Sequence, residues 1–418
     1  MSRALASVAP RTASVRAVVL TVACVQALWI LLYLAAGHQP RDFIKIGTRY
    51  VTKSHASRVI ELDPRYHYPA NHDGPPGQGY DGQFSYYMAL DLKHARYYMD
   101  RPGYRYTRVL YPLVVKGLAL DRPGAVPAVM IVVNWLAVVL GTLAVAVLLA
   151  RRGVSAWFAL LYGLFPGLAV SVQRDLTEPL AYGLVAAGLL VLDVGGRRRW
   201  PSAALVFALA GLARQTTLVF ALCVAIGLLM GDSLADERPT ARRLLVRLPV
   251  ALGFLLIAVA PYVAYASWLS AHIGPTTPHG SQFDVVPFQG IAESRPFRWA
   301  RQPVTFVTVV LPATLAAVVA IWAFLQRVWR WEVLCLLLNA LLFAILLGPG
   351  SSSFVYTSTG RNSIGVVLAS LLCLRLTRSR AFELHWRDRS FSWIVPVAAL
   401  WMSMLPVVMV YGFANFHT

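Results

Sequence analysis

The chain has 418 residues, of which 57% are hydrophobic and only 14% are charged, and its formal net charge is +19. Soluble domains carry about 25% charged residues. This chain instead repeats apolar runs of roughly 18 residues or more, each long enough to cross a hydrocarbon core about 30 Å thick. The composition therefore argues against an ordinary soluble domain and predicts an all-α, polytopic membrane protein.

A positive charge of this size is also typical of nucleic-acid-binding proteins, but its distribution argues against that partner. Half of the 38 Lys and Arg residues lie in segments that would all face one side of a membrane if the apolar runs cross it in turn. This positive-inside pattern predicts a cytoplasmic N-terminus, and anionic membrane lipids are sufficient partners for it. The residues are Arg3, Arg11, Arg16, Arg151, Arg152, Arg197, Arg198, Arg199, Arg238, Arg242, Arg243, Arg247, Arg327, Arg330, Arg375, Arg378, Arg380, Arg387 and Arg389.

In chain order, the apolar segments predict eleven crossings within one transmembrane domain, residues 1–418, with the C-terminus outside. The first crossing precedes a long polar segment, residues 37–106, that we expect on the outer face. Residues 108–120 are apolar but too short to span, and we expect them to lie in the interface or to re-enter. The expected crossings are 18–36, 125–150, 154–172, 179–194, two short helices within 201–230, 249–268, 304–325, 333–347, 363–376 and 393–413.

The segment 201–230 lies between two basic segments that should both be cytoplasmic, so an even number of crossings must separate them. A polar sequence, RQTT at 214–217, interrupts its centre. This pattern predicts two short helices that meet at a polar tip. Interrupted helices are tolerated where they are buried in protein or line a cavity, so the tip is a candidate part of a site.

The stretch 80–112, YDGQFSYYMALDLKHARYYMDRPGYRYTRVLYP, mixes acidic, basic and aromatic residues more densely than any other part of the chain. We interpret 37–106 as the catalytic loop of a membrane-embedded enzyme, with Asp81 as a general base near an acceptor hydroxyl. Asp-Gly is also a strong turn signal, and Asp caps helices. An N-cap is therefore the simpler interpretation of Asp81 from local sequence, and Asp42 and Asp73 are rivals for the role of the base.

Further charged residues fall at the outer helix ends of this topology. A charge at a helix centre costs roughly 2.5–3.5 kcal/mol on insertion scales, so their position predicts an acidic and basic cavity shared with Asp81. Structural interpretations stand beside this one, because a carboxylate can complement a helix dipole and an arginine can pair locally or extend to the interface. The residues are Arg174, Asp175, Glu178, Arg214 and Arg361.

Several of these segments resemble those of the GPI mannosyltransferase II (PIG-V-like) group, within the GT-C superfamily of polyprenyl-phosphate-sugar-dependent glycosyltransferases. The segments are YDGQFSYYMA, YRYTRVLYPL, LFPGLAVSVQRDLTEPLAYGL, GLARQTTL and STGRN. The chain departs from the group at Tyr80, where the eukaryotic members have Trp. It also has a longer Pro-, Gly- and His-rich segment before Asp81. These departures leave the sugar and the acceptor open.

The resemblance implies inverting transfer of mannose, or of another hexose or pentose, from a polyprenyl-phosphate donor to a lipid- or glycan-linked acceptor outside the cytoplasm. By this resemblance Asp81 takes the place of the catalytic carboxylate and Glu178 the second acidic position, while Arg214 and Arg361 contact the donor phosphate. No cofactor is implied, no spacing indicates a metal site, and the need for a divalent metal is left open. Further candidates for substrate contact are Tyr80, Gln83, Arg105, Arg108, Arg174 and Asp175.

The Ala-, Val- and Arg-rich composition indicates a bacterium with GC-rich DNA, and hence a multi-pass protein of the bacterial plasma membrane. The alternative function is a lipid or polysaccharide transporter or flippase without transferase activity, because interrupted helices are also a feature of transporters. The position of the charges favours the enzyme. A transporter would carry them near mid-membrane in paired repeats, whereas here they gather at helix ends beside a long loop.

Overall fold

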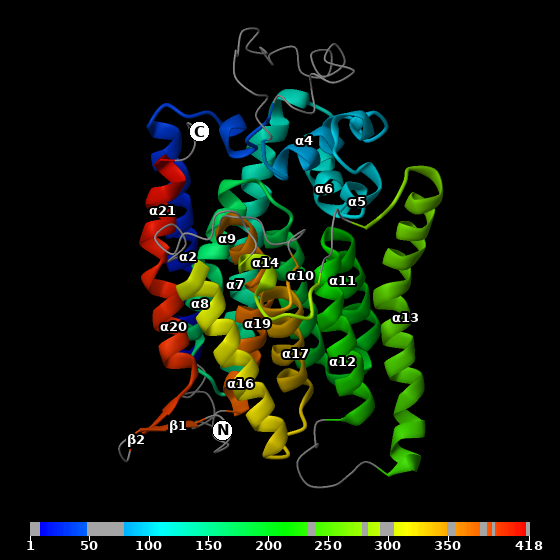
Figure 1. The fold of residues 1–418 in the computed structure, drawn as a ribbon, viewed down its shortest axis with the longest axis vertical. Coiled ribbons are helices and arrows are strands. Elements are labelled where there is room, and N and C mark those ends of the chain that lie inside the picture. The colour runs from blue at the N-terminus through cyan, green and yellow to red at the C-terminus, as the bar shows by residue number, and fades with distance from the viewer. Residues whose placement is uncertain are drawn as a thin grey trace.

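The computed structural model describes residues 9–47, 79–231, 240–277, 283–292, 305–348, 356–376, 383–386 and 389–414. Within these ranges the chain is almost entirely helical, and its long helices lie side by side in one bundle (Figure 1). The expected all-α class is therefore confirmed, with one addition. Strands β1 (Glu383–Trp386) and β2 (Arg389–Ser392) form an antiparallel hairpin in a segment that was expected to be a basic loop.

Five helices are long and apolar enough to cross a membrane, and a bent pair raises the number to six. The protein is therefore a multi-pass membrane protein by helix length and hydropathy. The predicted eleven crossings exceed the five or six that these two properties support. The five are α2 (Ala9–Ala35), α7 (Val126–Arg151), α10 (Glu178–Gly195), α13 (Ala241–His272) and the π-helical η8 (Phe306–Val310) continued by α16 (Leu311–Leu325).

Shorter apolar helices complete the bundle. The two short helices expected within 201–230 are present as α11 (Trp200–Ala213) and α12 (Leu218–Met230), joined by η6 (Gln215–Thr217). The others are α17 (Trp331–Ala340) with the π-helical η9 (Leu341–Ile345), α19 (Ile364–Cys373), α20 (Ile394–Ser403) and α21 (Leu405–Ala414). The short helix α18 (Tyr356–Asn362), which precedes α19, is polar. Helix α10 packs between α7 and α11, while α17 contacts α12, α16 and α19.

Two segments expected as single helices are interrupted at proline. Residues 154–172 form η4 (Ala156–Ala159), α8 (Leu160–Gly163) and α9 (Pro166–Gln173), with a bend of 45° between α8 and α9. Near the C-terminus, α20 and α21 separate just before Pro406. Proline lacks the N–H that would continue the helical ladder, and its ring clashes with the carbonyl four residues earlier.

A layer of short helices covers one end of the bundle (Figure 1). Its elements are η1 (Pro40–Phe43), α4 (Gly82–Leu90), η2 (Ala95–Tyr98), α5 (Pro102–Tyr106) and α6 (Leu110–Leu118). Its tyrosines form a buried core of their own, in which Tyr86, Tyr87, Tyr98 and Tyr111 are almost fully enclosed. The aromatic run of the sequence therefore positions this layer against the bundle. The remaining short elements are η3 (Pro123–Ala125), η5 (Gly196–Arg199), α14 (Gln289–Ala292) and η10 (Leu374–Leu376).

Cysteine labelling tests the sidedness that the charge pattern predicts. Helix α2 ends, and helix α13 begins, at opposite ends of the bundle (Figure 1). In a background in which the exposed Cys24 is replaced by Ala, Ala36→Cys should react with an impermeant maleimide applied to intact cells. Ala241→Cys should react only after permeabilisation, because it adjoins the Arg-rich end that the positive-inside rule places in the cytoplasm. Reaction of both variants in intact cells would contradict this topology.

Candidate functional site

A buried ion pair lies where α10 begins and α11 ends. The guanidinium of Arg214 approaches the carboxylate of Glu178, with Nη1 and Oε1 2.6 Å apart, and the two side chains are only 4% and 1% exposed. Arg214 ends α11 in extended conformation, and the chain turns there into η6. The break between α11 and α12 therefore places a charged side chain beside the first residue of α10.

Asp81 immediately precedes α4, yet its side chain makes no capping hydrogen bond. Its carboxylate instead faces three guanidinium groups from other parts of the chain. Arg361 Nη2 lies 2.8 Å from Oδ2, Arg105 Nη1 lies 3.0 Å from Oδ1, and Arg108 Nη1 lies 3.8 Å from Oδ2. The interpretation of Asp81 as a helix cap is therefore wrong for its side chain, which belongs to a charged cluster.

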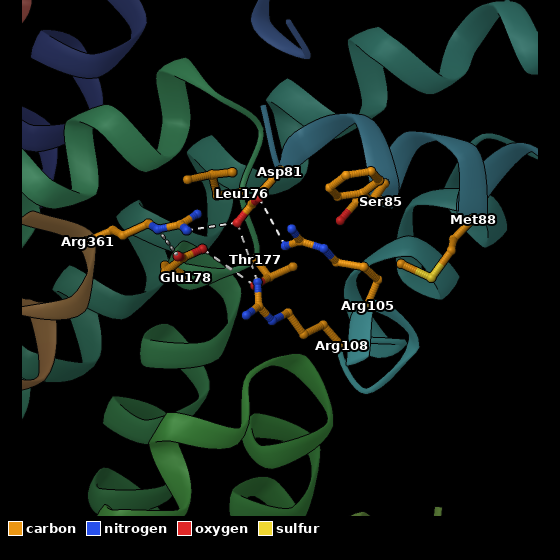
Figure 2. A pocket seen from close by; sticks show the side chains of 10 residues that line it. Asp81, Ser85, Met88, Arg105, Arg108, Leu176, Thr177, Glu178 and Arg361 are labelled. Carbon is orange, nitrogen blue, oxygen red and sulfur yellow. Dashed lines mark hydrogen bonds and ion pairs between the residues drawn. The ribbon is translucent and has the colours of Figure 1, made fainter. Parts of the chain in front are cut away.

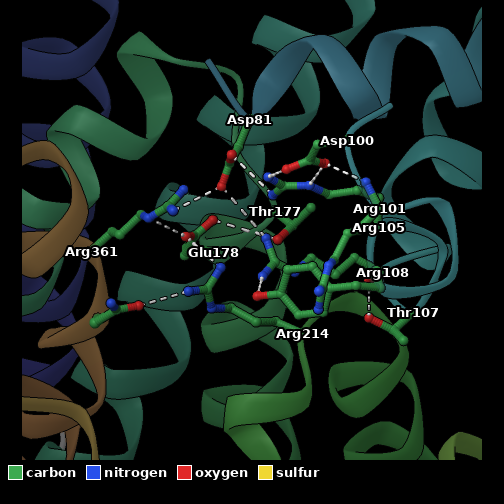
Figure 3. A network of polar contacts seen from close by, with 12 residues as sticks. Asp81, Asp100, Arg101, Arg105, Thr107, Arg108, Thr177, Glu178, Arg214 and Arg361 are labelled. Carbon is green, nitrogen blue, oxygen red and sulfur yellow. Dashed lines mark hydrogen bonds and ion pairs between the residues drawn. The ribbon is translucent and has the colours of Figure 1, made fainter. Parts of the chain in front are cut away.

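Arg361, in α18, connects Asp81 to the buried pair. Its Nε lies 3.6 Å from Glu178 Oε1, while its Nη2 contacts Asp81. The next residue, Asn362, accepts a 2.8 Å hydrogen bond through Oδ1 from Arg214 Nη2. Figure 3 shows the resulting network, which joins α5, α10, α18 and the ends of α4 and α11. The structure thus brings Asp81, Glu178, Arg214 and Arg361 into one network.

Three residues of this network were not singled out from the sequence: Asp100, Tyr104 and Asn362. Asp100 binds Arg105 through two hydrogen bonds of 2.8 Å, to Nε and Nη2. The hydroxyl of Tyr104 accepts a hydrogen bond from Arg108. The sequence could have indicated the Asp100–Arg105 pair. Pro102 favours the start of a helix, here α5, and a turn of helix between the two residues brings their side chains together. Asn362 has only its position next to Arg361.

Donor groups in this network remain without partners in the part of the chain that the structure describes. Arg108 Nε, Arg214 Nε and Arg361 Nη1 are buried and make no hydrogen bond to any described residue. Four guanidinium groups in the network face the three carboxylates of Asp81, Asp100 and Glu178. A buried donor without a partner costs about 1–3 kcal/mol or more, so the site favours an additional anion.

The residues around Asp81 enclose very little space. They line a cavity of about 10 Å³, roughly the room that one water molecule needs. Figure 2 shows Arg105, Arg108 and Arg361 directed at Asp81 and Glu178 across this cavity. The space among these side chains is therefore too small for a group larger than a water molecule.

Burial alone would raise the pKa of Asp81, but the surrounding guanidinium groups outweigh it and hold the pKa well below its usual range. The carboxylate is therefore ionised at neutral pH and is a weak base while all three arginines contact it. The same arginines also change the pKa of Tyr104. Burial would raise the pKa of its phenol, and the charge of Arg108, aided by further arginines, lowers it instead.

Two predicted substrate contacts, Arg174 and Asp175, lie beside the network rather than in the cavity. Asp175 is fully buried, with its Oδ1 3.4 Å from Asn134 Nδ2, and burial raises its pKa well above the usual value. Arg174 lies over the ring of Tyr80, 5.9 Å from its centroid. The turn packs tightly on the start of α4, because a Cβ added to Gly82 would stand 2.2 Å from the carbonyl oxygen of Arg174.

The remaining candidates differ in their contacts. Tyr80 also lies beneath Arg361, 5.4 Å from the guanidinium carbon. Gln83 Oε1 accepts a hydrogen bond of 3.0 Å from the N–H of Gly47. Asp42 is 43% exposed, and its Oδ2 accepts a 2.7 Å hydrogen bond from the N–H of Gln39. It takes no part in the network, and its rival Asp73 lies outside the described residues.

No group of three or more His, Cys, Asp or Glu side chains within the described ranges could hold a metal ion. The chemistry of the site is that of carboxylates and guanidinium groups around a small cavity.

No family model and no curated protein matches this sequence. The site must therefore be interpreted from its own geometry.

Glu178→Gln should destabilise the protein strongly. The substitution removes the charge that neutralises Arg214, a side chain only 4% exposed. Breaking a buried ion pair by removing one partner costs about 3–5 kcal/mol. Thermal unfolding in detergent, followed by tryptophan fluorescence, measures the change.

Two variants control this experiment. Asp42→Asn makes the same change of charge at an exposed carboxylate and should stay within about 0.5 kcal/mol of wild type. The double variant Glu178→Gln/Arg214→Gln removes both charges and should lose less stability than Glu178→Gln alone. A single variant as stable as wild type would mean that the pair does not hold these helices together.

Proposed function

We propose that this protein is an inverting glycosyltransferase that moves a sugar from a polyprenyl-phosphate donor to an acceptor hydroxyl. In the transfer, the acceptor oxygen forms a bond to the anomeric carbon while the bond between that carbon and the phosphate oxygen breaks. The acceptor proton passes to Asp81, and the bonding electron pair leaves with the polyprenyl phosphate. The donor already carries its phosphate on a lipid, so the reaction needs no nucleotide site.

The observation that carries this proposal is the cluster of buried arginines around Asp81 and Glu178. Three of their N–H donors lack partners in the described chain, and guanidinium groups suit phosphate geometry. The phosphate of the leaving group gains negative charge in the transition state, so donors fixed in place beforehand stabilise it more than they stabilise the ground state. Arg361 and Arg214 have this role in the proposal.

The same arginines link donor binding to the basicity of Asp81. Arg361 and Arg105 now contact the Asp81 carboxylate at 2.8 and 3.0 Å. A donor phosphate competes for these guanidinium groups. When it takes them over, Asp81 loses positive neighbours, its pKa rises, and it becomes a better proton acceptor. The acceptor is then deprotonated only when a donor is present.

Glu178 holds Arg214 and Arg361 in position in this proposal. Its Oε1 lies 2.6 Å from Arg214 and 3.6 Å from Arg361. A carboxylate between two phosphate-binding arginines fixes their orientation and balances part of their charge when no donor is bound. Arg105 is fixed in a similar way, because Asp100 binds it through two hydrogen bonds.

The proposed topology has eleven crossings and a bacterial plasma membrane as its location, with the Asp81 site at the outer end of the bundle. In chain order, the crossings are supplied by α2, α7, the bent pair α8 and α9, α10, α11, α12, α13, α16, α17, α19, and the pair α20 and α21. In this arrangement the donor lipid lies among the helices, and the acceptor approaches from outside.

The main alternative is a lipid or polysaccharide transporter or flippase. Transporters place ionisable groups near mid-membrane, at the interface of repeats. In this chain the network around Asp81 (Figure 3) lies beside the layer of short helices, which covers one end of the bundle (Figure 1). This position favours transfer chemistry at a membrane surface over passage through the bundle.

Asp81→Asn tests the proposal directly. The amide keeps the shape of the side chain but cannot accept the proton, so transfer of radiolabelled sugar from a polyprenyl-phosphate donor should fall roughly 10²–10⁴-fold. The assay compares membranes with matched amounts of protein.

Asp42→Asn and Asp73→Asn make the same change of charge and should retain transfer. Loss of transfer in one of these controls, with Asp81→Asn active, would identify a different carboxylate as the base. Normal transfer in all three would remove the support for an enzyme built on this loop.

The pH profile gives a separate prediction. Because its arginine neighbours hold the pKa of Asp81 low in the unbound protein, kcat/KM should not decline as the pH falls from about 8 to about 5. The acid limb of kcat should lie at higher pH than that of kcat/KM. A bound phosphate would pair with those arginines, and the pKa of Asp81 would then rise in the complex. Burial raises the pKa of Asp175, so an acid limb of kcat/KM near neutral pH would instead point to Asp175.

A further inference from the structure

A second cavity is enclosed among the ends of α7, α10, α12 and α17 and beside η10. These helix ends lie at the opposite end of the bundle from the layer of short helices that carries Asp81 (Figure 1). Its volume is about 220 Å³, compared with about 10 Å³ at Asp81. It is lined by Arg152, Leu189, Leu192, Asp193, Val224, Gly227, Leu228, Gly231, Trp331 and Arg375. The space is large enough for a phosphate-bearing headgroup, and nothing in the proposed transfer reaction uses it.

The charges around this cavity have a positive excess. Arg152 and Arg375 line it together with Asp193, and each arginine already contacts one carboxylate. Arg152 Nε lies 3.1 Å from Asp193 Oδ1, and Arg375 Nη2 contacts Oε1 of the buried Glu332. Both carboxylates also have a second arginine.

Those second arginines are Arg151, 2.8 Å from Asp193, and Arg330, 3.5 Å from Glu332. Four guanidinium groups therefore share two carboxylates around the cavity. Arg247, which donates a 2.7 Å hydrogen bond to the carbonyl of Met230 next to the lining residue Gly231, adds further positive charge. An anion placed here is attracted by this excess charge.

Arg152 has a hydrogen-bonding group left for a ligand. Its side chain is 11% exposed, and its Nη1 is buried with no hydrogen-bond partner among the described residues. A buried guanidinium N–H without a partner is costly. An oxygen ligand in the adjoining cavity would remove that cost.

The rest of the cavity wall suits a lipid. Leu189 and Val224 are buried, and Leu192 and Leu228 are partly exposed. The indole of Trp331 packs against α12 where it has no side chain, because a Cβ added to Gly227 would stand 2.7 Å from Trp331 Cδ1. Tryptophan is enriched at the level of lipid headgroups. Basic pockets between transmembrane helices bind anionic headgroups.

We propose that this cavity binds the phosphate headgroup of an anionic phospholipid from the leaflet at the basic end of the bundle, with Arg152 and Arg375 as phosphate ligands. The acyl chains follow the apolar wall of α10 and α12. This site is separate from the sugar-transfer site and does not depend on that function. It would give the protein a preference for membranes that contain anionic lipid.

Binding measurements on the full-length protein in neutral detergent test the proposal. Dioctanoyl phosphatidylglycerol should bind more tightly than dioctanoyl phosphatidylcholine, which has the same phosphate but no net charge. Arg152→Gln and Arg375→Gln should each weaken phosphatidylglycerol binding about tenfold, the effect of losing one charge-assisted hydrogen bond. Each variant leaves its carboxylate with a remaining arginine, Arg151 or Arg330, so folding should be preserved.

Arg151→Gln is the matched control. It removes the same charge and contacts the same Asp193, but Arg151 is 45% exposed and does not line the cavity. It should weaken phosphatidylglycerol binding much less than Arg152→Gln does, because it removes only a more distant part of the excess positive charge and no group that lines the cavity. An equal loss in Arg151→Gln would show attraction to general surface charge and would overturn the site. Equal binding of the two lipids would overturn the preference for an anionic headgroup. Arg152-dependent binding of inorganic phosphate alone, without binding of the lipid, would overturn the lipid as ligand.

A measurement on the wild-type protein covers the case in which the variants do not fold. Phosphatidylglycerol with a diazirine near its headgroup should crosslink to the end of α7, to α10, to α12, to the start of α17 or to η10, the elements that line the cavity. Excess phosphatidylglycerol should suppress the crosslinks more than phosphatidylcholine does. Crosslinks confined to other helices would overturn the proposal without any substitution.

Discussion

The ion pair between Glu178 and Arg214 is the constraint on which the arrangement of the candidate site depends. Neither charge can be left alone in so little solvent, because an unpaired buried charge costs several kcal/mol. Satisfying both requires the start of α10, the break between α11 and α12, and α18 to meet at one place, where Asn362 and Arg361 add further contacts. The interruption of the 201–230 segment is therefore part of how the bundle closes at this end.

Asp81 reaches that place from a different structural layer. The tyrosine core of the layer formed by α4, α5 and α6 fixes the start of α4, and Gly82 allows it to approach the turn at Arg174. Asp100 holds Arg105 against Asp81. The carboxylates of Asp81, Asp100 and Glu178 thus balance part of the positive charge of the arginines around them.

The two ends of the bundle use arginine differently. At the Asp81 end, the guanidinium groups surround carboxylates in a largely buried cluster around a cavity of about 10 Å³. At the other end, pairs of arginines share Asp193 and Glu332 beside an open cavity of about 220 Å³ with an apolar wall. Both arrangements keep buried guanidinium N–H groups without a hydrogen-bond partner in the described chain, but only the second has a large space beside such a group. A single apolar chain therefore holds two arginine–carboxylate clusters that differ in their geometry.

The sequence by itself determined the helical membrane class and the residues that gather at one end, because an apolar chain can place charges such as Glu178, Arg214 and Arg361 only at helix ends or breaks. It also indicated the two short helices of 201–230 through their central polar tip. Only the tertiary structure decided which charges meet. Local sequence favoured a cap for Asp81, whereas packing of α5 and α18 surrounds it with arginines. The contact between Arg214 and Asn362 likewise depends on how distant elements pack, and periodicity along one segment carries no information about that packing.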